Sequence, residues 1–135
     1  MNPLVPYLWV AGGIHLIIVA SNVLLPKKLH YWENLPKLSP IVRQIFVVHS
    51  VYIGLVLTIF SALCFFFAQE LAGGSLLGRF LSGCIALFWL IRIPLQLFYY
   101  DPEIRRENRL VDVGYTLAMV YSCVVFLVAA SGSVK

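Results

Sequence analysis

Four long apolar runs cover most of this chain of 135 residues. They span residues 4–25, 41–68, 76–100 and 110–130. Each run reaches the roughly 20 residues that a helix needs to cross about 30 Å of hydrocarbon. The strands of a membrane β-barrel are shorter and alternate in polarity, whereas these runs are apolar on every face. The pattern predicts an all-α fold, a four-helix transmembrane bundle that forms one integral membrane domain over residues 1–135.

The composition supports a membrane location. Hydrophobic residues make up 61% of the chain and charged residues 12%, against roughly 45–50% and about 25% in soluble domains. A single water-soluble core of this length could not bury such an excess. The longest polar stretch, residues 26–40, is too short for a separate soluble domain. Because the connectors are short, we expect an antiparallel up-down bundle.

The basic residues are distributed unevenly between the two sides of the predicted bundle. Only Arg79 and Lys135 belong to the side that also holds the termini. Seven lie in or beside the connectors 26–40 and 101–109: Lys27, Lys28, Lys37, Arg43, Arg105, Arg106 and Arg109. Short loops rich in Lys and Arg stay in the cytoplasm during insertion. We therefore expect both connectors to be cytoplasmic, both termini to be extracytoplasmic, and the chain to span a bacterial inner (cytoplasmic) membrane.

This arrangement also accounts for the net charge of +4. The basic connectors would be attracted to anionic lipid headgroups. No nucleic-acid partner is expected.

Three ionisable side chains are expected at one depth in the membrane. His15, His49 and Arg92 each lie eight to ten residues from the connector end of their run, or roughly 12–15 Å at about 1.5 Å per residue. An isolated Arg at the centre of a span costs about 2.5–3.5 kcal/mol on insertion scales. These side chains should therefore face the interior of the bundle and find partners there.

The nearest carboxylate to this layer is Asp112, at the start of the last run. Arg92 shares a helical face with Gln96 and can extend its side chain toward the membrane boundary. We therefore expect a structural ion pair between Arg92 and Asp112, with Glu103 or Asp101 as the next candidates.

The polar layer allows several interpretations, which the sequence leaves open. Two neutral imidazoles at one depth suit a bis-histidine haem b, with His15 and His49 as metal ligands and Arg92 near a propionate. A quinone could instead accept hydrogen bonds from a histidine or from Tyr52, with Gln96 nearby. Since neighbouring helices pack only about 8–10 Å apart, a macrocycle would require the histidine helices to splay. The side chains could also bind only one another and the backbone, or hold a lipid or a small anion.

The chain lacks recognisable catalytic patterns. All six carboxylates lie at or near the ends of the runs, and there is no G-x-S-x-G, H-E-x-x-H or C-x-x-C motif. We expect no enzyme activity from this chain alone. The expected function is that of a small non-catalytic accessory or assembly subunit of a larger membrane complex, with lipids and other membrane subunits as partners. The alternatives are an electron-transfer subunit that binds haem b or quinone, and a protein that binds lipid or transports a small solute.

Overall fold

Four long helices dominate the computed structural model, which describes residues 1–133. They are α1 (Val5–Lys28), α3 (Pro40–Phe66), α5 (Leu76–Pro94) with its π-helical extension η2 (Leu95–Tyr99), and α7 (Arg109–Ser131). Each is long and apolar enough to cross a membrane, and the part of the chain described contains no strand. The structure thus confirms the predicted all-helical, multi-pass character of the protein.

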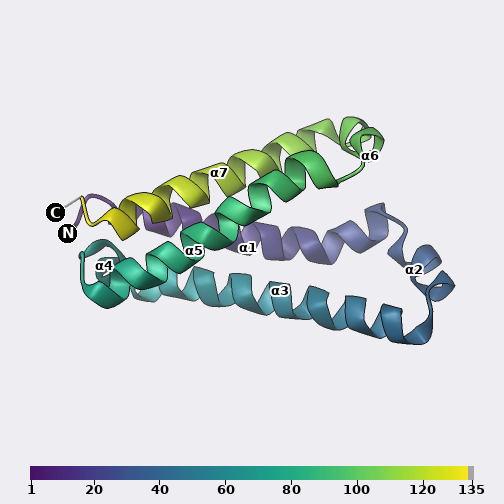
Figure 1. The fold of residues 1–135 in the computed structure, drawn as a ribbon, viewed down its shortest axis with the longest axis horizontal. Coiled ribbons are helices and arrows are strands. Elements are labelled where there is room, and N and C mark those ends of the chain that lie inside the picture. The colour runs from purple at the N-terminus through teal and green to yellow at the C-terminus, as the bar shows by residue number, and fades with distance from the viewer. Residues whose placement is uncertain (134–135) are drawn as a thin grey trace.

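Short helices fill the connectors. They are α2 (Tyr31–Asn34) and the 3-10 helix η1 (Leu35–Lys37) before α3, α4 (Ala68–Ala72) before α5, and α6 (Pro102–Glu107) before α7. In Figure 1, α1 and α5 run away from the end that holds both termini, and α3 and α7 return to it. We call this the terminal end, and the end that holds α2 and α6 the connector end.

Two prolines within the long helices have different consequences. The sequence predicts that the first helix stops at Pro26, but α1 continues to Lys28. A proline in the last turn removes only one backbone hydrogen bond, and the amide of Leu29 closes that turn on the carbonyl of Leu25 at 2.9 Å. Pro94 has a larger effect, since α5 changes to the π-helix η2 directly after it.

The core lies toward the terminal end. The closest helix pairs are α1 with α3 and α5 with α7, and α1 also touches α7. Fully buried side chains from all of these helices and from α4 meet there: Leu8, Leu57, Leu71, Ile85 and Phe126. The Ser61 hydroxyl of α3 donates a hydrogen bond to the Gly12 carbonyl of α1 at 2.9 Å. The terminal half of the bundle is therefore closely packed.

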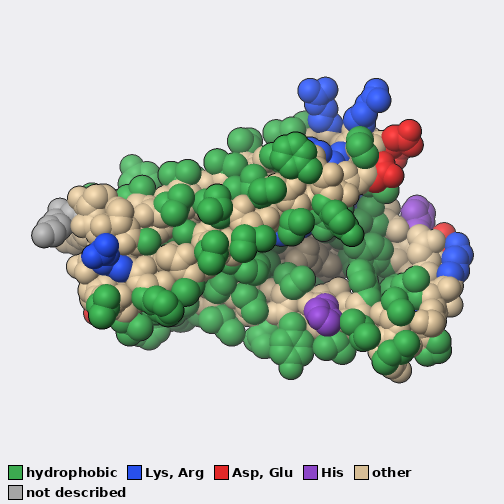
Figure 2. Space-filling model, in the orientation of Figure 1, with side chains coloured by type: hydrophobic (Ala, Val, Ile, Leu, Met, Phe, Trp, Pro, Cys, Tyr) green, Lys and Arg blue, Asp and Glu red, His purple; other side chains and the backbone are tan. Residues whose placement is uncertain are grey.

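The connector end is open. Along α3, every side chain from Gln44 to Ile53 is exposed. The ring contact of Phe60 with Phe88, 5.3 Å between centroids, joins α3 to α5 nearer the terminal end. Beyond it the two helices diverge (Figure 1), and Figure 2 shows a hollow between them. The bundle is thus closed at the terminal end and splayed at the connector end.

Candidate functional site

His15 occupies the centre of the bundle, in a box of aromatic rings. Its ring stacks on Trp89 at 5.3 Å and on Phe126 at 6.0 Å, and it meets Phe60 at 6.0 Å in a tilted contact. The imidazole is fully buried, and neither ring nitrogen has a hydrogen-bond partner. The prediction that His15 faces inward is confirmed, but the polar partners expected for it are aromatic rings instead.

His49 has different surroundings. Its side chain is exposed on α3, and its Nδ1 lies 2.8 Å from the Ile45 carbonyl, to which it can donate a local hydrogen bond. Protein atoms cover both nitrogens of His15, so no open position for a metal or a quinone oxygen remains there. Among residues 1–133, no group of three or more His, Cys, Asp or Glu side chains could hold a metal ion. The structure does not bring His15 and His49 together as the paired ligands of the haem b interpretation.

Within residues 1–133, Arg92 has no carboxylate partner. Its Nη2 donates to the Tyr100 hydroxyl at 3.2 Å, and its guanidinium carbon lies 5.1 Å from the centre of the Tyr100 ring. Its Nη1 is buried without a hydrogen-bond partner. In the described chain, the ion pairs are those of His30 with Glu33 and of Arg105 with Asp112. The charge of Arg92 is therefore balanced by no side chain.

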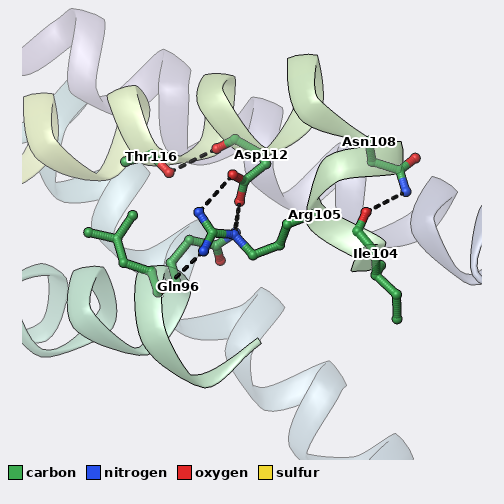
Figure 3. A network of polar contacts seen from close by, with 7 residues as sticks. Gln96, Ile104, Arg105, Asn108, Asp112 and Thr116 are labelled. Carbon is green, nitrogen blue, oxygen red and sulfur yellow. Dashed lines mark hydrogen bonds and ion pairs between the residues drawn. The ribbon is translucent and has the colours of Figure 1, made fainter. Parts of the chain in front are cut away.

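Asp112 is bound by Arg105 and Gln96, as Figure 3 shows. Arg105 donates from Nε and Nη2 to the two carboxylate oxygens, each at 2.9 Å, and Gln96 donates at 2.8 Å. The expected pair of Arg92 and Asp112 is thus replaced by a pair with Arg105. The reason is that α6 folds back beside α7 and presents Arg105 at the membrane boundary, whereas the Arg92 side chain ends at Tyr100. The bond to Asp112 raises the pKa of Arg105.

Tyrosines gather near Arg92 at the connector end. The Tyr115 hydroxyl is buried beside the Ser21 side chain and is in electrostatic range of Arg92. Burial and the nearby phenols of Tyr100 and Tyr115 raise the pKa of Tyr31, on α2. We call Tyr31, Arg92, Tyr100 and Tyr115 the arginine–tyrosine cluster. It joins side chains from α2, α5 with its extension, and α7.

An open apolar groove begins beside this cluster, between α1 and α7. Its first part, about 360 Å³, is lined by residues that include Ser21, Val111 and Tyr115. A second part, about 630 Å³, shares Ile14, Gly114 and Ala118 with the first and extends along α7 to Val124. The groove and the cluster meet at Tyr115.

The remaining candidates lie outside this region or play structural roles. Tyr52 is exposed on α3. Cys64, Cys84 and Cys123 are free thiols, of which only Cys84 is exposed.

The arginine–tyrosine cluster was not anticipated from the sequence. Tyrosines near the ends of spans are ordinary interfacial residues, and only the folding of α2 beneath the bundle brings Tyr31 toward the others.

Comparisons of the chain with protein-family models, with curated proteins and with solved structures found no match.

Proposed function

We propose that this chain is a non-catalytic integral subunit of a larger membrane complex, with an accessory or assembly role. A partner helix would bind the connector half of α3. The observation that carries this proposal is the exposure of every side chain from Gln44 to Ile53. This half of α3 extends away from α5 (Figure 1). Within residues 1–133 its ring contact is that of Phe46 with Tyr31 of α2, 5.5 Å between centroids, which leaves most of its surface open.

The exposed half of α3 carries polar groups that lipid would not satisfy. The Gln44 amide and the Tyr52 hydroxyl make no hydrogen bond within residues 1–133, and His49 uses one of its two nitrogens. Hydrocarbon offers no hydrogen bonds, so polar groups in a span are costly at a lipid surface. His49 and Tyr52 are three residues apart and therefore share one side of the helix. A transmembrane helix with Ser, Thr or Asn side chains would satisfy them.

The proposed orientation places the connector end in the cytoplasm and both termini outside, in a bacterial inner membrane. The support for it is the excess of Lys and Arg at the connector end, where Lys27, Lys28 and Arg106 are exposed. In this orientation the open half of the bundle lies in the cytoplasmic leaflet.

The electron-transfer alternative has less support from the geometry. It depends on His15, whose nitrogens are both covered, and on His49, which lies on the exposed part of α3.

Photocrosslinking in native membranes tests the proposed interface. A benzophenone amino acid at position 52 should give one discrete protein adduct, because that position faces the proposed partner. The same group at position 87 is the matched control, since Leu87 is also exposed but lies on α5. Position 87 should give no discrete adduct. The proposal fails if neither position yields a protein adduct and the purified chain is monodisperse and free of other proteins.

A further inference from the structure

We propose that the arginine–tyrosine cluster binds the anionic headgroup of a membrane lipid, with an acyl chain in the groove between α1 and α7. Arg92 and the groove belong to α5, α1 and α7, and Tyr31 of the cluster meets Phe46 in the exposed half of α3, 5.5 Å between ring centroids. Because the cation and the groove lie on other helices, the inference goes beyond the proposed subunit role and does not depend on it.

The first step of the argument is the unbalanced charge of Arg92. This guanidinium belongs to a membrane-spanning helix and has no carboxylate partner in residues 1–133. The phenol of Tyr100 accepts one hydrogen bond from Arg92, and its ring forms a cation–π contact with the guanidinium. Neither interaction neutralises the positive charge. The buried Nη1 is still without a partner. A cation within a span normally pairs with a counter-charge, so a ligand that completes this site would be an anion.

The second step is that neutral donors lie near the same guanidinium. The Tyr115 hydroxyl is buried beside the Ser21 side chain and is in electrostatic range of Arg92, and the Tyr31 phenol is in electrostatic range of Tyr100 and Tyr115. Trp89 is 3% exposed, its Nε1 also has no partner, and it precedes Arg92 by about one turn of α5. The acid expected to pair with Arg92, Asp112, is already held by Arg105. Asp101 and Glu103, which are nearer in sequence, form no ion pair with Arg92 within residues 1–133. A guanidinium with neutral hydroxyl donors is the chemistry that binds a phosphate or carboxylate group.

The third step is the groove, which distinguishes a lipid from a free anion. Its first part is lined by apolar side chains such as Ile17 and Val111, with Tyr115 at the boundary to the cluster. At Gly114 no atom lies within 4 Å of the position that a Cβ would take, so the floor of the groove is open. From Tyr115 to Val124 the groove follows about 14 Å of helix at about 1.5 Å per residue. This is about half of the roughly 30 Å hydrocarbon thickness, as one acyl chain requires.

The position along the bundle also fits a headgroup. The Arg92 side chain extends toward Tyr100, at the connector end of η2. Long basic side chains bring their charge toward the membrane boundary in this way. The anionic group would therefore lie near that boundary, with its acyl chain pointing toward the terminal end.

Native mass spectrometry of the full chain, delipidated in detergent, tests the site. The chain is titrated with phosphatidylglycerol, with phosphatidylcholine of the same acyl chains, and with inorganic phosphate alone. We expect one phosphatidylglycerol to bind about tenfold or more tightly than phosphatidylcholine, and Arg92→Gln to abolish that difference, as the loss of a charge-assisted hydrogen bond would. Arg106→Gln is the matched control, because Arg106 is exposed on α6, and it should bind phosphatidylglycerol as the natural chain does.

Gly114→Leu is a second, independent variant. It places a side chain in the open groove, and its Cβ would have no neighbouring atom within 4 Å, so it should fold even if Arg92→Gln does not. We expect it to weaken phosphatidylglycerol binding. Equal binding of the two lipids overturns the inference, as does an unchanged preference in both variants. Phosphate that competes fully with the lipid, with no effect of Gly114→Leu, would show a free-anion site and would also overturn it. None of these outcomes affects the crosslinking test at position 52.

Discussion

At the scale of single residues, His15 is the least expected feature of the structure. A buried imidazole always has at least one N–H to donate, and here neither nitrogen has a partner. Leaving a buried polar group unsatisfied costs about 1–3 kcal/mol. The aromatic rings of Trp89, Phe126 and Phe60 contribute packing but no acceptor in the ring plane. His15 is therefore a site where an apolar residue of similar size should suit the surroundings better.

We expect His15→Leu to raise the melting temperature of the purified protein by a few degrees. The substitution removes the unsatisfied imidazole while keeping most of its volume, and volume-conserving changes in a core are tolerated well. The melting temperature in detergent, followed by circular dichroism, measures the effect. His49→Leu is the control, because the His49 side chain is exposed on α3, and it should change little in the purified chain. A lower melting temperature for His15→Leu would mean that the imidazole has a ligand or a bound water in the membrane.

The polar residues show what the sequence can and cannot predict at this scale. Hydrocarbon disfavours isolated polar groups, so the inward position of His15 followed from its depth. The partner of Asp112 did not follow, because it depends on how α6 folds back. Arg105 was counted only as a connector charge, yet it is the residue that binds Asp112 at 2.9 Å.

At the scale of helices, the contact between α1 and α3 depends on Gly12. A Cβ at Gly12 would lie 2.8 Å from the Cβ of Cys64 and 3.2 Å from the ring of Phe65. The same approach allows the Ser61 hydroxyl to reach the Gly12 carbonyl. Small residues at such positions let transmembrane helices pack closely. Gly13, the next residue, has no neighbouring atom within 4 Å of its Cβ position.

We expect Gly12→Ala to destabilise the protein by about 1–3 kcal/mol, the usual cost of overpacking. Either α1 or α3 must move, and the bond from Ser61 weakens. Gly13→Ala is the matched control and should be neutral or slightly stabilising, since alanine favours helix by up to about 1 kcal/mol over glycine. Unfolding in a mixed-micelle titration measures both variants. Equal stability of the two would show that α1 and α3 do not meet at Gly12 in the membrane.

The long helices were more predictable than their packing. A span must be about 20 residues long and apolar, so a long apolar run in the sequence is enough to predict it. The end of α1 was placed too early because a proline in the last turn removes only one hydrogen bond, which left α1 free to reach Lys28. The divergence of α3 from α5 could not be predicted, because apolar residues serve equally well against lipid and against another helix.

At the scale of the whole molecule, packing and charge vary along the same axis. The terminal half holds the buried core, and the connector half is splayed and carries the exposed basic residues. A bundle of this kind can present its open half to lipids and partner helices in a single leaflet. Which leaflet that is depends on the orientation of the chain in the membrane, and the proposed one rests on the positive-inside rule.

Cysteine labelling tests this orientation. In a background where Cys64, Cys84 and Cys123 are replaced by alanine, single cysteines are introduced as Glu33→Cys in α2 and as Ser133→Cys near the C-terminus. Both positions are exposed, so each should react where reagent reaches it. With a membrane-impermeant maleimide applied to spheroplasts, we expect Ser133→Cys to be labelled at once and Glu33→Cys only after the membrane is permeabilised. The physical reason is that moving the basic connectors across the membrane is unfavourable, while the terminal side carries few charges. The opposite pattern would reverse the orientation and place the open half in the outer leaflet, and labelling of both sites in spheroplasts would show that the chain inserts in two orientations.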